Sequence, residues 1–314
     1  MKKKVVILGG GTGLSWLLKG LKEFPIDISA IVSVCDDGRS TGRLREEFNI
    51  PAMGDIRKVL VSMASTEPLV EKLLNYRFET TSDLNGHTVG NLLLTASKEI
   101  TGNMSDGIEA LGKVLNLKGK VIPFSEDNVI LMGEMKDGSI VEGEHNITES
   151  NKKIKRVYYK EEPTITKECK TAIKEADLII LSMGSLYTSI IPNLICKDMI
   201  EEIDKSKADI MYCCNIVTQP GETLGFKASD HIKLLNSYLG NKKISVGIFN
   251  HEEMDPELVI KYATEEQKDP VLLDKENLKD IEVIEDDLIT IDDNRFRHDT
   301  MRLAFLIFEY LLRR

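Results

Sequence analysis

The sequence predicts an α/β fold, a Rossmann-like, doubly wound and mostly parallel sheet with a small antiparallel β excursion. Short, continuously apolar runs alternate with helical patterns, and they lie at 5–8, 28–35, 178–181, 210–214 and 244–249. Runs that are apolar throughout are typical of parallel strands covered on both faces. The first run also stops in a glycine-rich turn that leads directly into a helical pattern, as at the first turn of such folds.

Helical periodicity recurs between these runs and continues toward the last residues. It is clearest in the segments 55–64, 91–100, 106–115, 169–176 and 300–312. The last of these is apolar nearly all round, so we expect it to be buried in the fold or in a contact with another subunit. A homo-oligomer is therefore possible from the sequence, which does not distinguish a subunit contact from burial within the fold.

A different pattern between about residues 120 and 166 predicts the antiparallel excursion. Short β-like runs replace the helical patterns there, and Asp137-Gly138 is typical of a hairpin turn. The sequence has no Pro-, Gly- or Ser-rich linker, internal repeat or low-complexity tract. We therefore interpret residues 1–314 as a single nucleotide-binding α/β domain that carries this β-rich segment.

The first turn predicts a phosphate-bearing ligand. A β-branched strand ends at Gly9, and Gly10, Gly11, Thr12 and Gly13 follow before the helical pattern is established. Backbone N–H groups converge on an anion at such turns, and the positive end of the following helix favours negative charge. The spacing lacks the lysine of a P-loop and does not match the glycine pattern of a standard NAD site.

An acidic pair, Asp36 and Asp37, follows the second apolar run. In folds of this class, a carboxylate at the tip of the second strand grips a ribose hydroxyl. Ser40 and Arg43, in the loop that follows, are candidates for contacting phosphates. The plainer interpretation is a loop with capping aspartates and solvated arginines. The combination of the acidic pair with the glycine turn favours a nucleotide site.

Two later segments carry further candidates. Asn91 follows His87 in a polar, glycine-flanked stretch, and it could bond to a base or sugar unless the stretch is only a structural turn. The turn after the run 178–181 carries Gly184, Ser185 and Thr188, and a similar polar turn occupies 215–223. Because the carboxyl ends of parallel strands share one edge of a sheet, we expect these turns and the glycine turn to line one cleft.

Composition limits the classes of function. The chain of 314 residues is 42% hydrophobic and 29% charged, as in ordinary globular proteins, and its net charge is −10. This charge argues against a general nucleic-acid surface and against an anionic membrane partner. No apolar run resembles a signal peptide or approaches the roughly 20 residues of a membrane span. The five cysteines lack metal-like C-x-x-C spacing. We expect a cytoplasmic, reduced protein.

Several motifs occur together: GGGTGLS at 9–15, GSLYTSIIPNL at 184–194, TQPGET at 218–223 and RHD at 297–299. With them the sequence resembles the bacterial gluconeogenesis factor family (YvcK-like), in a superfamily with 2-phospho-L-lactate transferase (CofD-like). The resemblance runs from Lys4 to the terminal helix. It departs from the family pattern at Arg39, Lys58 and Ser182-Met183, which affects the expected shape of two ligand-contacting loops.

The resemblance implies a cytoplasmic protein that binds a UDP-sugar, with UDP-N-acetylglucosamine favoured. It implies a regulator needed for cell shape and cell-wall precursor supply on gluconeogenic carbon sources, acting with a partner enzyme of amino-sugar or cell-wall precursor synthesis. Beyond the two small-residue turns, it implies ligand contacts from Asp37, Asn193, Tyr262 and Arg297. Arg297 suits a diphosphate, and Tyr262 suits uracil or ribose unless it is a core residue.

Three functional hypotheses follow. The first is a UDP-sugar-binding regulator, because the sequence shows no nucleophile–base pair, zinc spacing or Walker lysine, and so no catalytic residue is predicted. The second is a CofD-like transferase acting on a nucleotide diphosphate substrate, in which Asp36 and Asp37 would hold a divalent metal. The third is an NAD-dependent oxidoreductase, which the glycine spacing disfavours. No cofactor is assigned apart from the bound UDP-sugar and, for the second hypothesis, the metal.

Overall fold

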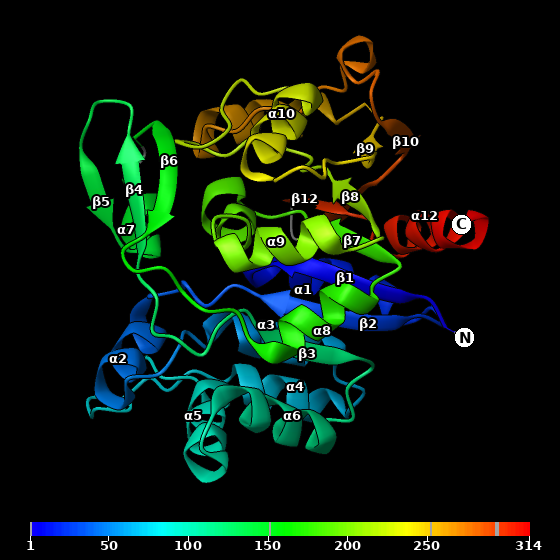
Figure 1. The fold of residues 1–314 in the computed structure, drawn as a ribbon. Helices are drawn as coiled ribbons and strands as arrows, with labels where there is room; N and C mark the ends of the chain where they lie inside the picture. The colour runs from blue at the N-terminus through cyan, green and yellow to red at the C-terminus, as the bar shows by residue number, and fades with distance from the viewer. Residues whose placement is uncertain (1, 151, 252, 293–294) are drawn as a thin grey trace.

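The computed structural model describes residues 2–150, 152–251, 253–292 and 295–314, except for the side chain of residue 39. Within these residues a seven-stranded sheet has the order β10-β9-β8-β7-β1-β2-β3, and its paired strands run parallel (Figure 1). Its strands are β1 (Lys4–Gly9), β2 (Asp27–Val32), β3 (Lys120–Pro123), β7 (Leu178–Leu181), β8 (Asp209–Cys213), β9 (Val246–Asn250) and β10 (Glu282–Asp286). The predicted doubly wound α/β fold is confirmed.

The order of the strands reverses beside β1. From β1 the chain builds β2 and β3 on one side, and β7 to β10 later fill the other side. β1 pairs with β7, with Val5 opposite Leu178 and Leu8 opposite Leu181. Open α/β sheets bind ligands outside the carboxyl ends of the strands where the order reverses. The turns that follow β1 and β7 lie at the carboxyl edge of the sheet, where the strand order reverses.

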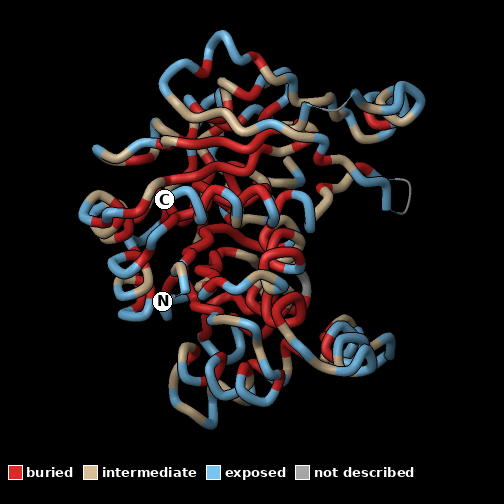
Figure 2. The backbone as a smooth tube through the Cα atoms, turned by 90° about the vertical axis from the view of Figure 1, so that its right-hand side faces the viewer, coloured by how far each residue is buried: buried red, intermediate tan, exposed pale blue. Residues whose placement is uncertain are grey.

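Helices cover both faces of the sheet. α1 (Gly11–Leu21), α3 (Gly54–Met63) and α12 (Thr300–Arg313) pack on one face, and α8 (Lys167–Glu175) and α9 (Lys197–Lys205) on the other (Figure 1). The remaining α-helices are α2 (Arg39–Phe48), α4 (Pro68–Asn75), α5 (Val89–Thr101), α6 (Met104–Val114), α7 (Glu144–Glu149), α10 (Ala228–Tyr238) and α11 (Pro256–Lys261). Short helical turns lie at Leu186–Ile190, Ile191–Asn193, Tyr262–Glu266 and Lys275–Asn277. Figure 2 shows the buried residues running through the strands at the centre of the molecule.

The terminal helix α12 is buried along one side. Leu303 and Ile307 are buried, whereas Phe305 is 47% exposed. The helix packs against α1. The expectation that this helix is buried in the fold is therefore confirmed for one of its faces. Among the described residues, no helix has the length and apolar character needed to cross a membrane.

A three-stranded antiparallel sheet stands beside the main sheet (Figure 1), with the order β5-β4-β6. Its strands are β4 (Leu131–Met135), β5 (Ile140–Glu142) and β6 (Ile154–Tyr159), and a separate pair joins β11 (Ile289–Asp292) to β12 (Arg295–His298). Asp137 and Gly138 lie in the turn between β4 and β5, as predicted. One boundary is corrected: the excursion does not begin at Lys120, because β3 pairs with β2 in the main sheet. A four-residue apolar run does not reveal which sheet it will join.

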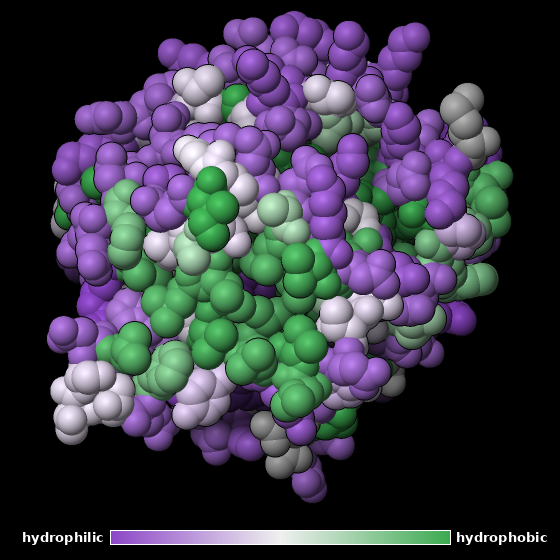
Figure 3. All heavy atoms as spheres, turned by 90° about the horizontal axis from the view of Figure 1, so that it is seen from below, coloured by the Kyte–Doolittle hydropathy of each residue, from purple (hydrophilic) through white to green (hydrophobic). Residues whose placement is uncertain are grey.

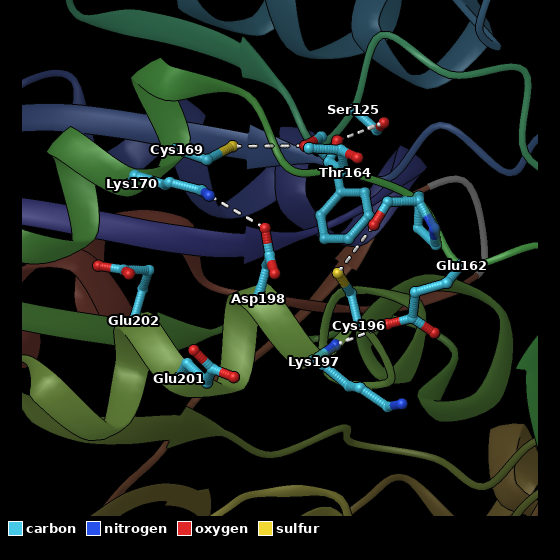
Figure 4. A network of polar contacts seen from close by, with 12 residues as sticks. Ser125, Glu162, Thr164, Cys169, Lys170, Cys196, Lys197, Asp198, Glu201 and Glu202 are labelled. Carbon is cyan, nitrogen blue, oxygen red and sulfur yellow. Dashed lines mark hydrogen bonds and ion pairs between the residues drawn. The ribbon is translucent and has the colours of Figure 1, made fainter.

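Polar contacts, several of them from buried groups, join α8, α9, the end of β3 and the chain that returns from the antiparallel sheet (Figure 4). The Cys196 thiol donates to the carbonyl oxygen of Pro163 at 3.3 Å, and the Cys169 thiol donates to that of Pro123 at 3.4 Å. Burial raises the pKa of Cys169 to about 12. These thiols are therefore uncharged structural donors. All five cysteines of the chain are free and buried.

Candidate functional site

A cleft of about 460 Å³ opens at the carboxyl edge of the sheet, where the strand order reverses. This volume lies in the range typical of small-molecule sites. It is lined by residues of the turns 10–13 after β1, 183–189 after β7 and 215–219 after β8. Residues from α1, α3, α7 and β12, together with Asp36 and Lys268, complete the lining. The three polar turns thus meet at one cleft, as the sequence predicts.

The first two turns approach closely because Gly13 has no side chain. A Cβ atom on Gly13 would lie 1.5 Å from the main-chain oxygen of Met183, far inside any tolerable contact. Gly11 has φ +55°, in the left-handed region that favours glycine. The glycines of this turn are therefore required by the geometry of the cleft floor.

The N-terminal end of α1 faces the cleft through Gly10, Gly11, Thr12 and Gly13. Gly10 is the N-cap residue in an extended conformation, and no described side chain caps the helix at that residue. The first N–H groups of a helix have no partner inside the helix, and they carry the positive end of its dipole. An anionic group bound in the cleft would satisfy these donors.

Glu222 of the third turn holds the second turn in shape. The Ser185 hydroxyl donates to the Glu222 carboxylate, 2.5 and 2.7 Å from its two oxygens, and the Tyr187 N–H donates to it at 3.1 Å. Burial raises the pKa of Glu222 to about 6, although the hydrogen bonds from Ser185 and Tyr187 oppose that rise. Asn215 Nδ2 donates to the Gly184 oxygen at 2.8 Å. The motifs at 184–194 and 218–223 therefore form one hydrogen-bonded unit.

Three carboxylates, Asp36, Asp55 and Glu144, line part of the cleft. Asp55 lies against the glycine turn, because a Cβ atom on Gly10 would be 2.9 Å from one of its oxygens. Lys58 pairs with Asp55 at 3.0 Å, and it opposes the rise in the Asp55 pKa that burial causes. Burial, with the nearby charges of Asp36 and Asp55, raises the pKa of Glu144 to about 8. Glu144 is therefore largely protonated at neutral pH.

Cationic and flat apolar side chains complete the lining. The cations are Lys58, Lys268 and Arg297, and the largest apolar groups are Trp16 and Phe296. Cations stabilise a bound diphosphate by charge-assisted hydrogen bonds. Aromatic rings offer stacking surfaces for a base or a sugar ring. The cleft therefore combines cationic side chains with flat aromatic surfaces.

The structure brings several of the residues that the sequence singles out to the cleft. Those that line it are Gly10, Gly11, Thr12, Gly13, Gly184, Ser185, Thr188 and Arg297. Those that do not are Asp37, Ser40, Arg43, Asn91, Asn193 and Tyr262.

Asp37 and Asn193 support the cleft from behind its lining. Asp37 Oδ1 accepts a hydrogen bond from the His145 N–H at 2.8 Å and so satisfies a donor in the first turn of α7, the helix that carries Glu144. Asn193 is fully buried, and its Nδ2 donates to the Ser189 oxygen at 2.9 Å. Both side chains thus position residues that line the cleft.

Ser40 and Asn91 belong to a buried network beneath the 86–91 segment. The Ser40 hydroxyl lies 3.0 Å from His87 Nδ1 and accepts from Asn91 Nδ2 at 3.2 Å. Asn91 Oδ1 in turn accepts from Arg57 Nε at 3.1 Å. Arg43 lies at the surface and donates to main-chain oxygens of the 83–85 loop. These groups stabilise the loop rather than face the cleft.

Tyr262 lies in a small apolar cluster beside β12. Its hydroxyl accepts a hydrogen bond from the Phe296 N–H at 2.9 Å, and the two ring centroids are 5.1 Å apart. Tyr262 is 5% exposed. It therefore fixes the backbone of the strand that presents Phe296 and Arg297 to the cleft.

The site prediction omitted several lining residues, among them Trp16, Asp55, Lys58, Glu144, Thr148, Gln219, Lys268 and Phe296. The sequence could have indicated Asp55 as a lining residue, since it follows a glycine in the conspicuous GDIR segment at 54–57. No sequence pattern indicates Glu144 and Thr148 as lining residues, because α7 reaches the cleft only through the packing of the antiparallel sheet.

A larger hollow of about 1,090 Å³ lies at the opposite edge of the sheet, around the amino ends of β1, β2 and β3. Lysines and acidic residues both line it, and some pair directly, as Lys4 does with Glu175 at 2.7 Å. Ligands of open α/β sheets bind at the carboxyl ends of the strands. The smaller cleft is therefore the stronger candidate site.

Comparison with known proteins identifies the family of the chain. A family model described as 2-phospho-L-lactate transferase CofD matches residues 5–289. The chain is 47% identical over 313 residues to the gluconeogenesis factor of Bacillus subtilis (strain 168), covering 99% of this chain and 98% of that protein. The chain belongs to the gluconeogenesis factor family, within the CofD superfamily.

Further similarities support membership of this family. A second gluconeogenesis factor, from Halalkalibacterium halodurans, is 45% identical over 311 residues, 98% of this chain and 96% of that protein. The crystal structure of a Bacillus halodurans protein superimposes with a TM-score of 0.94 at 44% identity, covering 98% of this chain and 100% of that chain. The family resemblance stated from the motifs is thus confirmed.

Proposed function

We propose that the cleft binds a UDP-sugar, UDP-N-acetylglucosamine in particular, and that the protein regulates cell-wall precursor supply in response. The observation that carries the proposal is the N-terminal end of α1, which faces the cleft with Gly10 as its N-cap. A diphosphate is the ligand group that best matches several main-chain donors together with a helix dipole.

The rest of the lining suits the two ends of such a ligand. Arg297 and Lys268 can neutralise the diphosphate, and Phe296 and Trp16 offer apolar surface for the uracil or the sugar ring. Hydroxyl and amide groups of the later turns, including Thr218 and Gln219, can bond to sugar hydroxyls.

A regulatory role is favoured over catalysis by the chemistry of these groups. The Ser185 hydroxyl is hydrogen-bonded to a carboxylate that also accepts from the Tyr187 N–H and from Gln219 Nε2, which is the environment of a positioning contact. The gluconeogenesis factor names of the relatives support a role in carbon partitioning. We propose that the bound protein acts on a partner enzyme of amino-sugar or cell-wall precursor synthesis, and so maintains cell shape on gluconeogenic carbon sources.

Isothermal titration calorimetry with UDP-N-acetylglucosamine, UDP-glucose, UDP and UMP tests the binding. We expect Arg297→Ala to weaken binding of the UDP-sugar about 10- to 100-fold, because a charge-assisted hydrogen bond is lost. Arg295→Ala is the matched control, since Arg295 lies two residues earlier on the same strand and does not line the cleft. Failure of every uridine nucleotide to bind at millimolar concentration overturns the proposal.

A CofD-like transferase is the second candidate, because the matching family model carries that description. Within the described ranges, no group of three or more His, Cys, Asp or Glu side chains could hold a metal ion. Asp36 lines the cleft, but Asp37 bonds to α7. Turnover of a phospho-lactate acceptor with a deazaflavin would establish the transferase, whereas recovery of intact UDP-sugar favours the regulator.

A further inference from the structure

An apolar surface lies on the outer side of α4 and α5, and none of its residues lines the cleft. Figure 3 shows a continuous hydrophobic field on the face seen from below, the side on which Figure 1 places α4, α5 and α6. On α4 and its C-cap, Leu69, Leu73 and Tyr76 recur at spacings of four and three residues, and so lie on one side of the helix. Leu69 is 73% exposed, and the other two are more than half exposed.

The helix α4 is weakly anchored within its own chain. Of its eight residues, only Leu74 is buried. A helix this short is marginal in water by itself, and helices of folded proteins owe most of their stability to a buried apolar face. The apolar side of α4 that would supply this stability is instead directed to solvent.

The neighbouring helix α5 is apolar on two sides. Its inner side buries Leu94, while Leu93, Ala96 and Ile100 form an outer stripe at spacings of three and four residues. Ile100 is 84% exposed. The outer side of a surface helix is normally polar or charged. Together, the stripes of α4 and α5 form what we call the α4–α5 face: Leu69, Leu73, Tyr76, Leu93, Ala96 and Ile100.

We propose that the α4–α5 face is the interface at which two copies of this chain form a symmetric dimer. Its large side chains expose on the order of 600 Å² of apolar surface, the upper end for a monomer. A homodimer interface about two-thirds apolar would then bury roughly 900 Å² per copy, which is the size of a standard stable interface.

Charge favours a second copy as the occupant. Two molecules with a net charge of −10 repel each other, so their contact is best made through a neutral surface. α4 carries one Glu and one Lys, Glu71 and Lys72, and α5 likewise carries Lys98 and Glu99, so each helix is neutral. A surface with both signs at its edge can complement itself across a two-fold axis.

Sedimentation velocity over micromolar to submillimolar concentrations tests this interface. We expect a particle of twice the chain mass of 35.3 kDa. Leu73→Glu and Ile100→Glu, made separately, each place two like charges in the apolar contact, and we expect each to raise the dimer dissociation constant at least about 30-fold. Circular dichroism checks that each variant is folded. If a glutamate variant does not fold, the milder substitution Ile100→Ser is measured in its place.

Phe305→Glu is the matched control, because it changes an exposed large apolar residue on α12, the competing surface. We expect this variant to remain dimeric. A protein that is monomeric throughout the concentration range overturns the proposal. Dimers that persist in both the α4 and α5 variants also overturn it, and so does dissociation by Phe305→Glu alone.

Discussion

Glu144→Gln is expected to stabilise the folded protein at alkaline pH. The pKa of Glu144 is raised from 4.5 to about 8 by burial and by Asp36, Asp55 and Asp37. The unfolded chain therefore releases its proton near pH 4.5, and the folded protein does so only near pH 8. The free energy of unfolding thus falls as the pH rises from about 4.5 to 8. A shift of this size corresponds to roughly 5 kcal/mol, and solvent screening reduces the expected effect to about 2–3 kcal/mol.

Urea denaturation at pH 5 and pH 9 measures this difference. Gln keeps the shape of Glu and can still accept the hydrogen bond from Thr148, so we expect the variant to equal the unmodified protein near pH 5 and exceed it by about 2–3 kcal/mol at pH 9. Glu149→Gln, an exposed position on the same helix, should leave the pH dependence unchanged. Identical pH profiles for the Glu144→Gln variant and the unmodified protein would refute the reasoning.

Three further changes test other parts of the fold. Gly13→Ala places a Cβ atom 1.5 Å from the Met183 oxygen, so we expect a loss of more than about 3 kcal/mol in urea denaturation. Tyr262→Phe leaves the Phe296 N–H without its acceptor and should lower stability by about 1–2 kcal/mol; an unchanged thermal midpoint contradicts this role. Burial lowers the pKa of His298 to about 4, so stability should fall by up to about 3 kcal/mol between pH 6.5 and 4, and His298→Gln should remove that loss.

The central strands could be predicted because their environment is uniform. β1 and β7 are buried along nearly their whole length, so their residues form continuous apolar runs. β10 (Glu282–Asp286) escaped prediction because it is the edge strand, half-buried and acidic, and its register depends on β9. The placement of β3 in the main sheet depends in the same way on a neighbour that is distant in the sequence.

The lining of the cleft could be predicted where it consists of local turns. The glycine turn and the turn at 184–188 are local features, fixed by residues next to one another. The sequence also singles out Asp37 and Asn193, but the roles of these side chains depend on partners elsewhere in the fold. The partner of Asp37 is 108 positions away, on α7. Side-chain direction, unlike turn chemistry, requires the tertiary structure.

The charge of the cleft depends on whether the carboxyl group of Glu144 is protonated. The lining holds three cationic side chains, Lys58, Lys268 and Arg297, and three carboxyl groups, Asp36, Asp55 and Glu144. While Glu144 is protonated, the cations of the lining outnumber its ionised carboxylates, although the whole molecule carries −10. Ionisation of Glu144 adds a negative charge to this lining. The burial that raises the pKa of Glu144 to about 8 thus keeps the cleft suited to an anionic ligand at neutral pH.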